Sequence, residues 1–223
     1  ELTMDPAMVR AVCVRAHELG FAVAAHVVST EGVRVALEGG VDSIEHGAAP
    51  TDEIMGLFKK NGSFLCTTIS PALPYALFDR SVSCASEVEQ YNGNMVFEGI
   101  IANSKAALEQ GVPVALGNDV GCPWITQYDF WRELRYFEKY VGVSRSFALH
   151  TATLRNAQLA GVGDVTGLIE VGKDADMIVV DANPLDDLCA LRTPRHVIHR
   201  GRLIAKPNVK RNAVVDRELD KFL

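Results

Sequence analysis

Three side chains that can bind a metal ion occupy equivalent places in this sequence. His26, His46 and Asp119 each stand where an apolar run typical of β-strands gives way to a polar loop. Two neutral imidazoles and a carboxylate suit a divalent ion such as zinc. Because such an ion lowers the pKa of a bound water, a ligating carboxylate can also accept the water's proton, so we expect Asp119 to be both ligand and general base.

The elements that must position these residues alternate between strand and helix. Apolar residues recur at three- and four-residue steps from Asp5 to Leu19, which predicts a helix that Gly20 ends. We expect strands at 21–26, 41–46, 63–69 and 112–119, helices at 31–38, 51–60 and 87–110, and a proline loop after the third strand. The first three strands begin about 21 residues apart, which fits strand-helix units with short loops and predicts a parallel sheet.

This order is typical of a TIM-type (β/α) barrel, in which the chemistry lies at the carboxyl ends of the strands. A closed barrel has eight strands in about 250 residues, whereas four units are recognised here, so the chain is interpreted as the second half of one. Helices are expected at 127–140 and 144–159, and short strands at 167–170, 175–181 and 196–199. We therefore expect two domains, a half-barrel at 1–160 and a small β domain with a C-terminal tail at 161–223.

Composition excludes several classes of function. A hydrophobic content of 48% and a charged content of 22% are typical of a soluble globular protein. A net charge of -6 argues against nucleic-acid binding, and no apolar run approaches the ~20 residues that a membrane helix needs. The five cysteines are scattered and odd in number, which predicts no disulfide framework and favours the cytoplasm. The chain also opens almost directly on a helix, so we expect a segment upstream of it.

Five segments carry a more specific resemblance. They are Ala25-His-Val-Val-Ser, Gly40-Val-Asp-Ser-Ile-Glu-His-Gly47, Gly117-Asn-Asp-Val-Gly121, the run from Ala152 to Gly161, and the run from Gly167 to Asp181. Together they resemble the carboxyl-terminal half of an amidohydrolase-superfamily enzyme, in the imidazolonepropionase-like branch that includes Xaa-Pro and arginine or lysine dipeptidases. The resemblance covers the chain from Thr3 to about Ile204.

The resemblance implies a role for each candidate residue. His26 matches the metal histidine after the fifth barrel strand, His46 the one after the sixth, and Asp119 the aspartate after the eighth. It also implies that the short strands after Gly161 form part of a β-sandwich. The implied cofactor is zinc or another divalent metal, with one or two ions in the complete site, and the implied substrate is a small amide or dipeptide, although no substrate-binding residue is identified.

The chain departs from the family pattern in two ways. The His-x-His pair after the first strand and the bridging carboxylated lysine after the fourth belong to segments that this sequence lacks. Related deaminases carry a glutamate three residues after the fifth-strand histidine, where this chain has Ser29, and this favours hydrolysis of an amide. The leading hypothesis is a metal-dependent amidohydrolase that cleaves a C–N bond. The alternative is an inactive half-barrel with an incomplete metal site, which self-associates into a homo-oligomer or needs a separate N-terminal half.

Other reactive side chains are expected to have structural roles. His150 is expected to pack within a helix, and a spacing of three puts His196 and His199 on opposite faces of a strand. Cys122 is expected to line the pocket near Asp119, but it has no neighbouring base that would make it a nucleophile.

Overall fold

The computed structural model describes residues 2–223 and consists of two compact units that meet in sequence between Gly117 and Asn118. This boundary directly follows the fourth strand. The domain boundary expected after residue 160 is a different division of the chain, and it stays a prediction.

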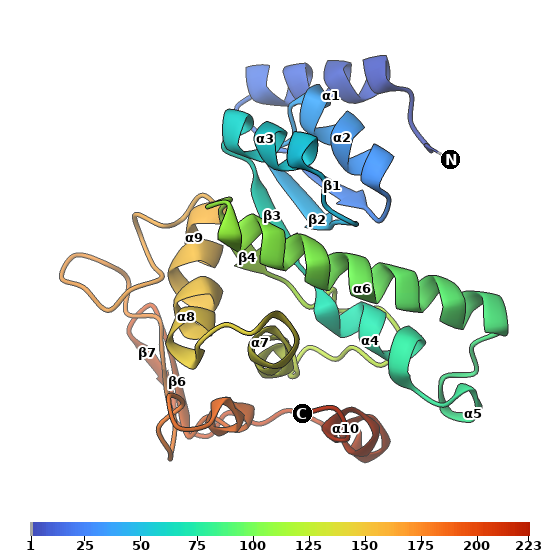
Figure 1. The fold of residues 1–223 in the computed structure, drawn as a ribbon. Coiled ribbons are helices and arrows are strands. Elements are labelled where there is room, and N and C mark those ends of the chain that lie inside the picture. Colours follow the sequence, from blue (N-terminus) through green and yellow to red (C-terminus); the bar gives the residue numbers. More distant parts are fainter. Residues whose placement is uncertain (1) are drawn as a thin grey trace. The chain divides into compact units, whose positions relative to one another are not determined.

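The first unit alternates strands and helices, as Figure 1 shows. Its strands are β1 (Ala24–Val27), β2 (Ser43–His46), β3 (Phe64–Thr67) and β4 (Val114–Leu116). Its helices are α1 (Pro6–Glu18), α2 (Thr30–Gly39), α3 (Asp52–Asn61), α4 (Ile69–Leu77), α5 (Arg80–Ser83) and α6 (Glu87–Glu109). The helices begin where the sequence provides caps: the side chains of Ser29, Thr51 and Ser86 accept hydrogen bonds from the first turns of α2, α3 and α6.

The four strands form one parallel sheet in the order β1-β2-β3-β4. Its central strands are mostly buried and are covered by helices, as parallel strands generally are: Ile44 and Leu65 are fully buried, and Phe58 of α3 and Ile100 of α6 are at most 1% exposed. The predicted α/β class and the parallel arrangement are confirmed. Since consecutive parallel strands end at the same edge, the sheet directs the residues that follow β1 and β2 to one place.

Helix α4 replaces the proline loop that the sequence suggested after the third strand. Pro71 lies in the first turn of α4, where a backbone N–H has no partner within the helix, so its missing donor costs little. Pro74 lies further inside the helix. The buried side chains of Ile69 and Leu73 support α4 against α6, which runs beside it in Figure 1. Tertiary burial therefore outweighs the local signal of two prolines.

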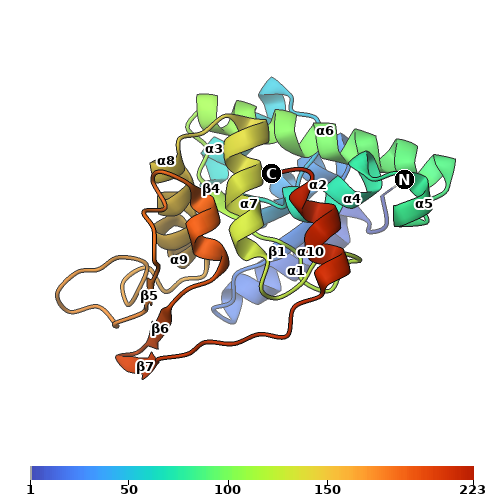
Figure 2. The ribbon, with the colours of Figure 1, turned by 90° about the horizontal axis from the view of Figure 1, so that it is seen from below.

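The second unit contains short helices and a small antiparallel sheet (Figure 2). Its helices are α7 (Phe130–Tyr136), the π-helix η1 (Phe137–Val141), α8 (Arg145–His150), the π-helix η2 (Thr151–Arg155), α9 (Asn156–Leu159), the 3₁₀-helix η3 (Leu188–Arg192) and α10 (Ala213–Asp220). Its strands are β5 (Met177–Val179), β6 (His196–His199) and β7 (Arg202–Ile204). The helices predicted at 127–140 and 144–159 are confirmed in outline, with π-helical turns within them.

The small sheet differs from the prediction in two places. The strand expected at 167–170 is wrong, because this stretch forms a bend and irregular backbone in which Gly167 has a φ of 96°. Strand β7 was not anticipated and pairs with β6, for example Ile198 with Leu203. The β-sandwich implied by the resemblance, like the half-barrel, stays a prediction.

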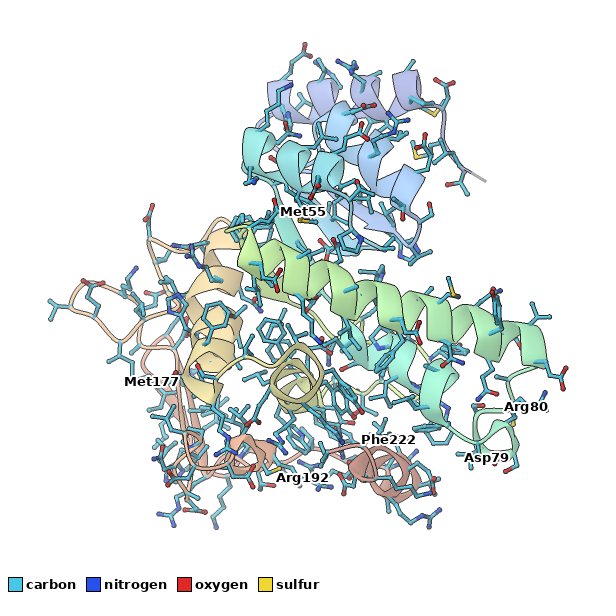
Figure 3. The ribbon with its side chains drawn as sticks, in the orientation of Figure 1. Met55, Asp79, Arg80, Met177, Arg192 and Phe222 are labelled. Atoms are coloured by element: carbon cyan, nitrogen blue, oxygen red, sulfur yellow. The ribbon has the colours of Figure 1, made fainter. Side chains whose placement is uncertain are left out.

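The expected C-terminal tail contains a helix, α10. The side chain of Asn212 caps its first turn, and Asp216 and Leu219 are buried at 8% and 2% exposure. The sequence alone predicted no helix in this tail. The structure buries one face of α10 because arginines elsewhere in the second unit neutralise its aspartates (Figure 3, in which Arg192 is labelled).

None of the helices among residues 2–223 is long and apolar enough to cross a lipid bilayer.

Candidate functional site

His26 and His46 lie at the carboxyl ends of the adjacent strands β1 and β2. Nδ1 of His26 lies 2.7 Å from Nε2 of His46, and the two rings stand nearly perpendicular at 78° with centroids 4.5 Å apart. His46 is only 7% exposed, whereas His26 is open to solvent. The structure thus brings together these two of the three predicted metal ligands.

The contact between the rings depends on the backbone of His46. In the register of the two strands, His26 is opposite Glu45 and Val27 is opposite His46. Side chains alternate between the faces of a regular strand, so His26 and His46 would point to opposite faces. His46 instead has a φ of 70°, in the left-handed region. This turn ends β2, breaks the alternation and lets the imidazole reach His26.

Gly47 makes that turn sterically feasible. Its own φ is 83°, and a Cβ at this position would lie 2.3 Å from Nδ2 of Asn103, a fully buried residue of α6. Two consecutive left-handed residues against a packed helix leave no space for a side chain. The glycine after His46 therefore belongs to the structural basis of the site.

Thr68 holds the other nitrogen of His46. Its hydroxyl Oγ1 lies 2.5 Å from His46 Nδ1, and its side chain is 3% exposed. We assign the proton to Nδ1, which donates to the hydroxyl, so that Nε2 keeps its lone pair toward His26. The sequence alone did not predict this contact. Thr68 directly follows β3, and this position at a strand end is the feature that could have indicated it.

Asp119 is the second residue of the second unit and lies three residues after β4. It is exposed and has a φ of 51°, a left-handed conformation that aspartate tolerates better than most residues. Its carboxylate Oδ2 accepts a hydrogen bond from the thiol of Cys122 at 3.1 Å. Burial, together with this hydrogen bond to the carboxylate, raises the pKa of the Cys122 thiol to about 11. The thiol therefore stays protonated at neutral pH, although the expectation that no base neighbours Cys122 is wrong, because the Asp119 carboxylate contacts it.

The three predicted ligands are divided between the two units, with the histidines in the first and Asp119 in the second. Across the part of the chain that the structure describes, no group of three or more His, Cys, Asp or Glu side chains is arranged to hold a metal ion. The convergence of all three residues at one rim stays a prediction.

The remaining histidines have separate surroundings. His150 ends α8 with its side chain exposed, so the expectation that it packs inside a helix is wrong; it lies on the solvent side of its last turn. On β6, His196 contacts the carbonyl of Ala205 at 2.7 Å and His199 contacts Asp176 at 2.8 Å. These two histidines do not share a partner, in agreement with their spacing.

Comparisons with known proteins identify relatives of this chain in sequence and in fold. The sequence profile of the amidohydrolase family matches residues 2–204. A crystal structure assigned as a prolidase from Bifidobacterium longum is 41% identical, with a TM-score of 0.96 over 99% of this chain and 56% of that chain. The structure of a Xaa-Pro dipeptidase with methionine bound in its active site is 32% identical, with a TM-score of 0.80 over 91% of this chain and 49% of that one.

Among curated proteins, the ochratoxinase of Aspergillus niger is 28% identical over 193 residues, which are 84% of this chain and 38% of the ochratoxinase. The chain thus spans roughly two fifths to three fifths of the length of these relatives. The family profile, however, extends over nearly all of the chain, including His26, His46 and Asp119. The chain therefore belongs to the amidohydrolase family.

Proposed function

We propose that this chain supplies metal ligands and the general base of a metal-dependent amidohydrolase that hydrolyses the C–N bond of an amide or dipeptide. The observation that supports this most strongly is the pair formed by His26 and His46, whose ring nitrogens face each other at 2.7 Å beyond two parallel strands. Membership of the amidohydrolase family supports the reaction class.

The donor chemistry of the pair fits a divalent metal ion. Two ring nitrogens 2.7 Å apart cannot both present lone pairs, so one carries a proton that bridges them. These two nitrogens are the atoms through which His26 and His46 would hold a divalent metal ion. The hydrogen bond from His46 Nδ1 to Thr68 orients His46 in the way that outer hydrogen bonds commonly orient metal-bound histidines.

Zinc is the first candidate, held by His26, His46 and Asp119, with one or two ions in the complete site. When bound, the ion supplies Lewis acidity toward the scissile carbonyl and makes a water molecule more acidic. The carboxylate of Asp119 accepts the proton from that water and returns it to the leaving nitrogen.

A dipeptide or another small amide is the proposed substrate class. Two of the structural relatives are described as a prolidase and a Xaa-Pro dipeptidase. Ser29 stands where related deaminases carry a glutamate, which favours amide hydrolysis over deamination.

The proposal extends to the architecture. The parallel sheet β1–β4 is proposed to be the second half of a (β/α) barrel, strands 5 to 8, with a domain boundary near residue 160 and with β5–β7 as part of a β-sandwich. The cytoplasmic location remains a prediction based on the scattered cysteines.

One observation favours the second candidate, an inactive chain with an incomplete site. The chain covers 56% of the related prolidase structure and 38% of the ochratoxinase. In this second candidate, the parallel sheet β1–β4 has open edges, and it pairs with a separate N-terminal half or with another copy of the chain.

Two measurements test the proposal. Each is made on this chain alone and on the protein encoded by its complete open reading frame. Zinc binding is followed by calorimetry, and hydrolysis is followed on a panel of Xaa-Pro and Xaa-Arg dipeptides. We expect the complete protein both to bind zinc and to hydrolyse dipeptides. Zinc binding without hydrolysis in the chain alone would support the second candidate, and a zinc-loaded complete protein that hydrolyses no dipeptide or amide would refute the first.

Point variants assign the residues. His26→Ala and His46→Ala are expected to weaken zinc binding by about tenfold or more. Asp119→Asn is expected to lower kcat/KM by about 10²- to 10⁴-fold. His150→Ala, which removes an exposed histidine at the end of α8, is the matched control and should change neither quantity.

A further inference from the structure

The segment that connects Asp119 to helix α7 is a succession of hydrogen-bonded turns. Each amide reaches back three residues; two turns share Cys122, two share Asp129, and a peptide bond joins the two pairs at Ile125–Thr126. The amides of Cys122, Ile125, Asp129 and Arg132 donate to the carbonyls of Asp119, Cys122, Thr126 and Asp129 at 3.2, 3.0, 3.1 and 2.8 Å. The turns therefore restrain the backbone on both sides of the Ile125–Thr126 peptide, between the candidate base and the first turn of α7.

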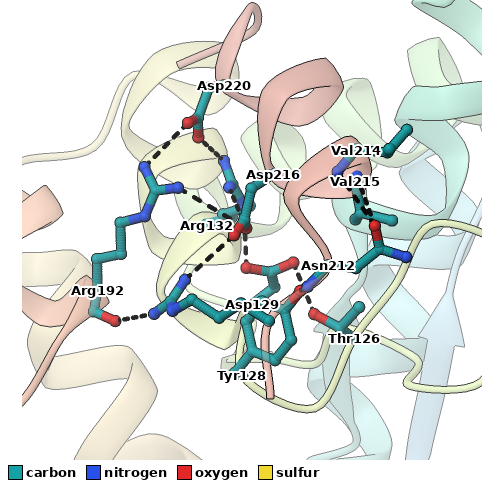
Figure 4. Close-up of polar contacts among 11 residues, drawn as sticks. Thr126, Tyr128, Asp129, Arg132, Arg192, Asn212, Val214, Val215, Asp216 and Asp220 are labelled. Carbon is teal, nitrogen blue, oxygen red and sulfur yellow. Dashed lines mark hydrogen bonds and ion pairs between the residues drawn. The ribbon is translucent and has the colours of Figure 1, made fainter. Parts of the chain in front are cut away.

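The far end of this segment is fixed at Asp129. This carboxylate is 3% exposed, and both of its oxygens are occupied. The hydroxyl of Thr126 donates to Oδ2 at 2.7 Å, and Nε of Arg132 donates to Oδ1 at 3.1 Å (Figure 4). Asp129 thus joins the last turn of the segment to the guanidinium of Arg132.

Arg132 in turn is held by α10. Its side chain is 1% exposed, and its two terminal nitrogens donate to Asp216 at 3.1 Å and to Asp220 at 2.6 Å (Figure 4). A planar guanidinium with acceptors on three sides has one orientation that satisfies all of them. The same two aspartates also pair with Arg192, at 3.7 Å and 3.0 Å.

A second tie joins α10 to the segment. The residue that caps α10, Asn212, donates its backbone N–H to the hydroxyl of Tyr128 at 2.7 Å, while its side chain accepts from Val214 at 3.1 Å. Helix α10 is therefore attached to the segment at Tyr128 directly and at Asp129 through Arg132.

Asp119 itself has few contacts of its own. Its side chain is exposed, and among residues 2–223 its carboxylate accepts one hydrogen bond, from Cys122, which belongs to the same segment. Its left-handed backbone is a conformation that a free loop would leave easily. The placement of the carboxylate must then come from the segment and from whatever holds the segment.

We propose that Arg132, clamped by Asp216 and Asp220, is a positioning residue for Asp119, so that the C-terminal helix α10 braces the loop that carries the general base. The catalytic part of this inference rests on the proposed function, whereas the mechanical part does not. Arg132 acts through Asp129 and the turns and does not touch the substrate.

Hydrogen exchange of the backbone amides tests the brace without any activity. In the complete protein, the double variant Asp216→Asn/Asp220→Asn is expected to raise exchange at the amides of Cys122 and Ile125 by about tenfold. Tyr128→Phe, which removes one hydroxyl and keeps the ring, should raise it by about threefold. Asp164→Asn removes an exposed aspartate of the second unit and should leave it unchanged.

Steady-state kinetics test the role in catalysis. Loosening the loop should lower kcat at nearly constant KM, in proportion to the increase in exchange at Cys122. Arg132→Lys should also lower kcat, because an ammonium group lacks the planar fork of the guanidinium. Faster exchange in α10 with unchanged exchange at Cys122 and Ile125 would overturn the brace. Faster exchange at those amides with unchanged kcat would overturn the positioning role. A protein without hydrolytic activity but with the expected exchange pattern would refute the proposed function and keep the brace.

Discussion

The two histidines and Asp119 are positioned by different means. His26 and His46 lie on neighbouring strands of one parallel sheet, where strand register and a turn of two left-handed residues bring their rings together. Asp119 lies on an irregular segment whose far end is attached to a helix about a hundred residues later in the sequence. The first arrangement is local to a sheet edge, whereas the second depends on contacts between distant parts of the second unit. Damage to one should therefore leave the other largely intact, and the following variants test that separation.

The largest effect is expected from removal of the guanidinium at the centre of the second arrangement. Arg132→Met leaves three aspartates without their shared cation, and breaking a buried ion pair in this way costs about 3–5 kcal/mol. Chemical denaturation measures the loss. The separation predicts that zinc still binds the histidine pair of any protein that remains folded, and complete loss of zinc binding by folded protein would contradict it.

A smaller but sharp effect is expected at the turn after β2. Gly47→Ala combines positive-φ strain with a clash against Asn103, for a total of about 3 kcal/mol. Gly62→Ala is the matched control, because Gly62 has a φ of 70° but nothing within 4 Å of an added Cβ, so it should cost about 1 kcal/mol. If Asn103→Ala does not recover part of the Gly47→Ala loss in the double variant, the clash is not the cause.

Removing the hydrogen bond between His46 and Thr68 should affect the first arrangement and leave the second unchanged. Thr68→Val keeps the shape of the side chain and removes the acceptor of His46 Nδ1. Loss of such an outer hydrogen bond commonly weakens metal binding by about 10- to 100-fold. Calorimetry with zinc measures this, while amide exchange at Cys122 should not change. An equal effect on both would mean that the two arrangements are coupled.

Acid should weaken the second arrangement through the carboxylate of Asp220. Burial alone would raise the pKa of Asp220, but hydrogen bonds from Arg132 and Arg192 outweigh it and hold this pKa below the usual 3.8. The carboxylate that faces these two arginines therefore contributes its full stabilisation above that usual value. The contribution is lost as the pH falls through the lower folded-state pKa. The protection factors of the α10 amides, which correct for the intrinsic pH dependence of exchange, should fall in this range, and Asp220→Asn should abolish that pH-dependent fall.

The smallest effect concerns Cys122. Because burial and the contact with Asp119 raise its pKa to about 11, about one thiol in a thousand is ionised at pH 8. Iodoacetamide should therefore modify the exposed Cys84 well before Cys122, as peptide mass analysis would show. Rapid modification of Cys122 would mean that its thiol does not donate to Asp119.

Local patterns in the sequence were sufficient for much of the fold. The helix from Asp5, the repeat of parallel strands and the strand at His196–His199 follow from periodicity and capping residues, which act over a few neighbours. The choice of His26, His46 and Asp119 as candidates followed from residue type and from their places next to strand ends. The alternation of strand and helix patterns also indicated the α/β class.

Only the tertiary structure decided the features that depend on distant partners. Helix α4 forms through two prolines because its apolar side is buried against α6, and α10 is ordered because Arg132 and Arg192 receive its aspartates. The left-handed turn at His46, which brings the imidazoles together, requires the space that Gly47 leaves beside Asn103. The sequence by itself determined where strands and helices are favourable and which side chains can do chemistry. The tertiary structure decided where those side chains point, because burial, charge compensation and steric fit are properties of residues that the chain brings together only when it folds.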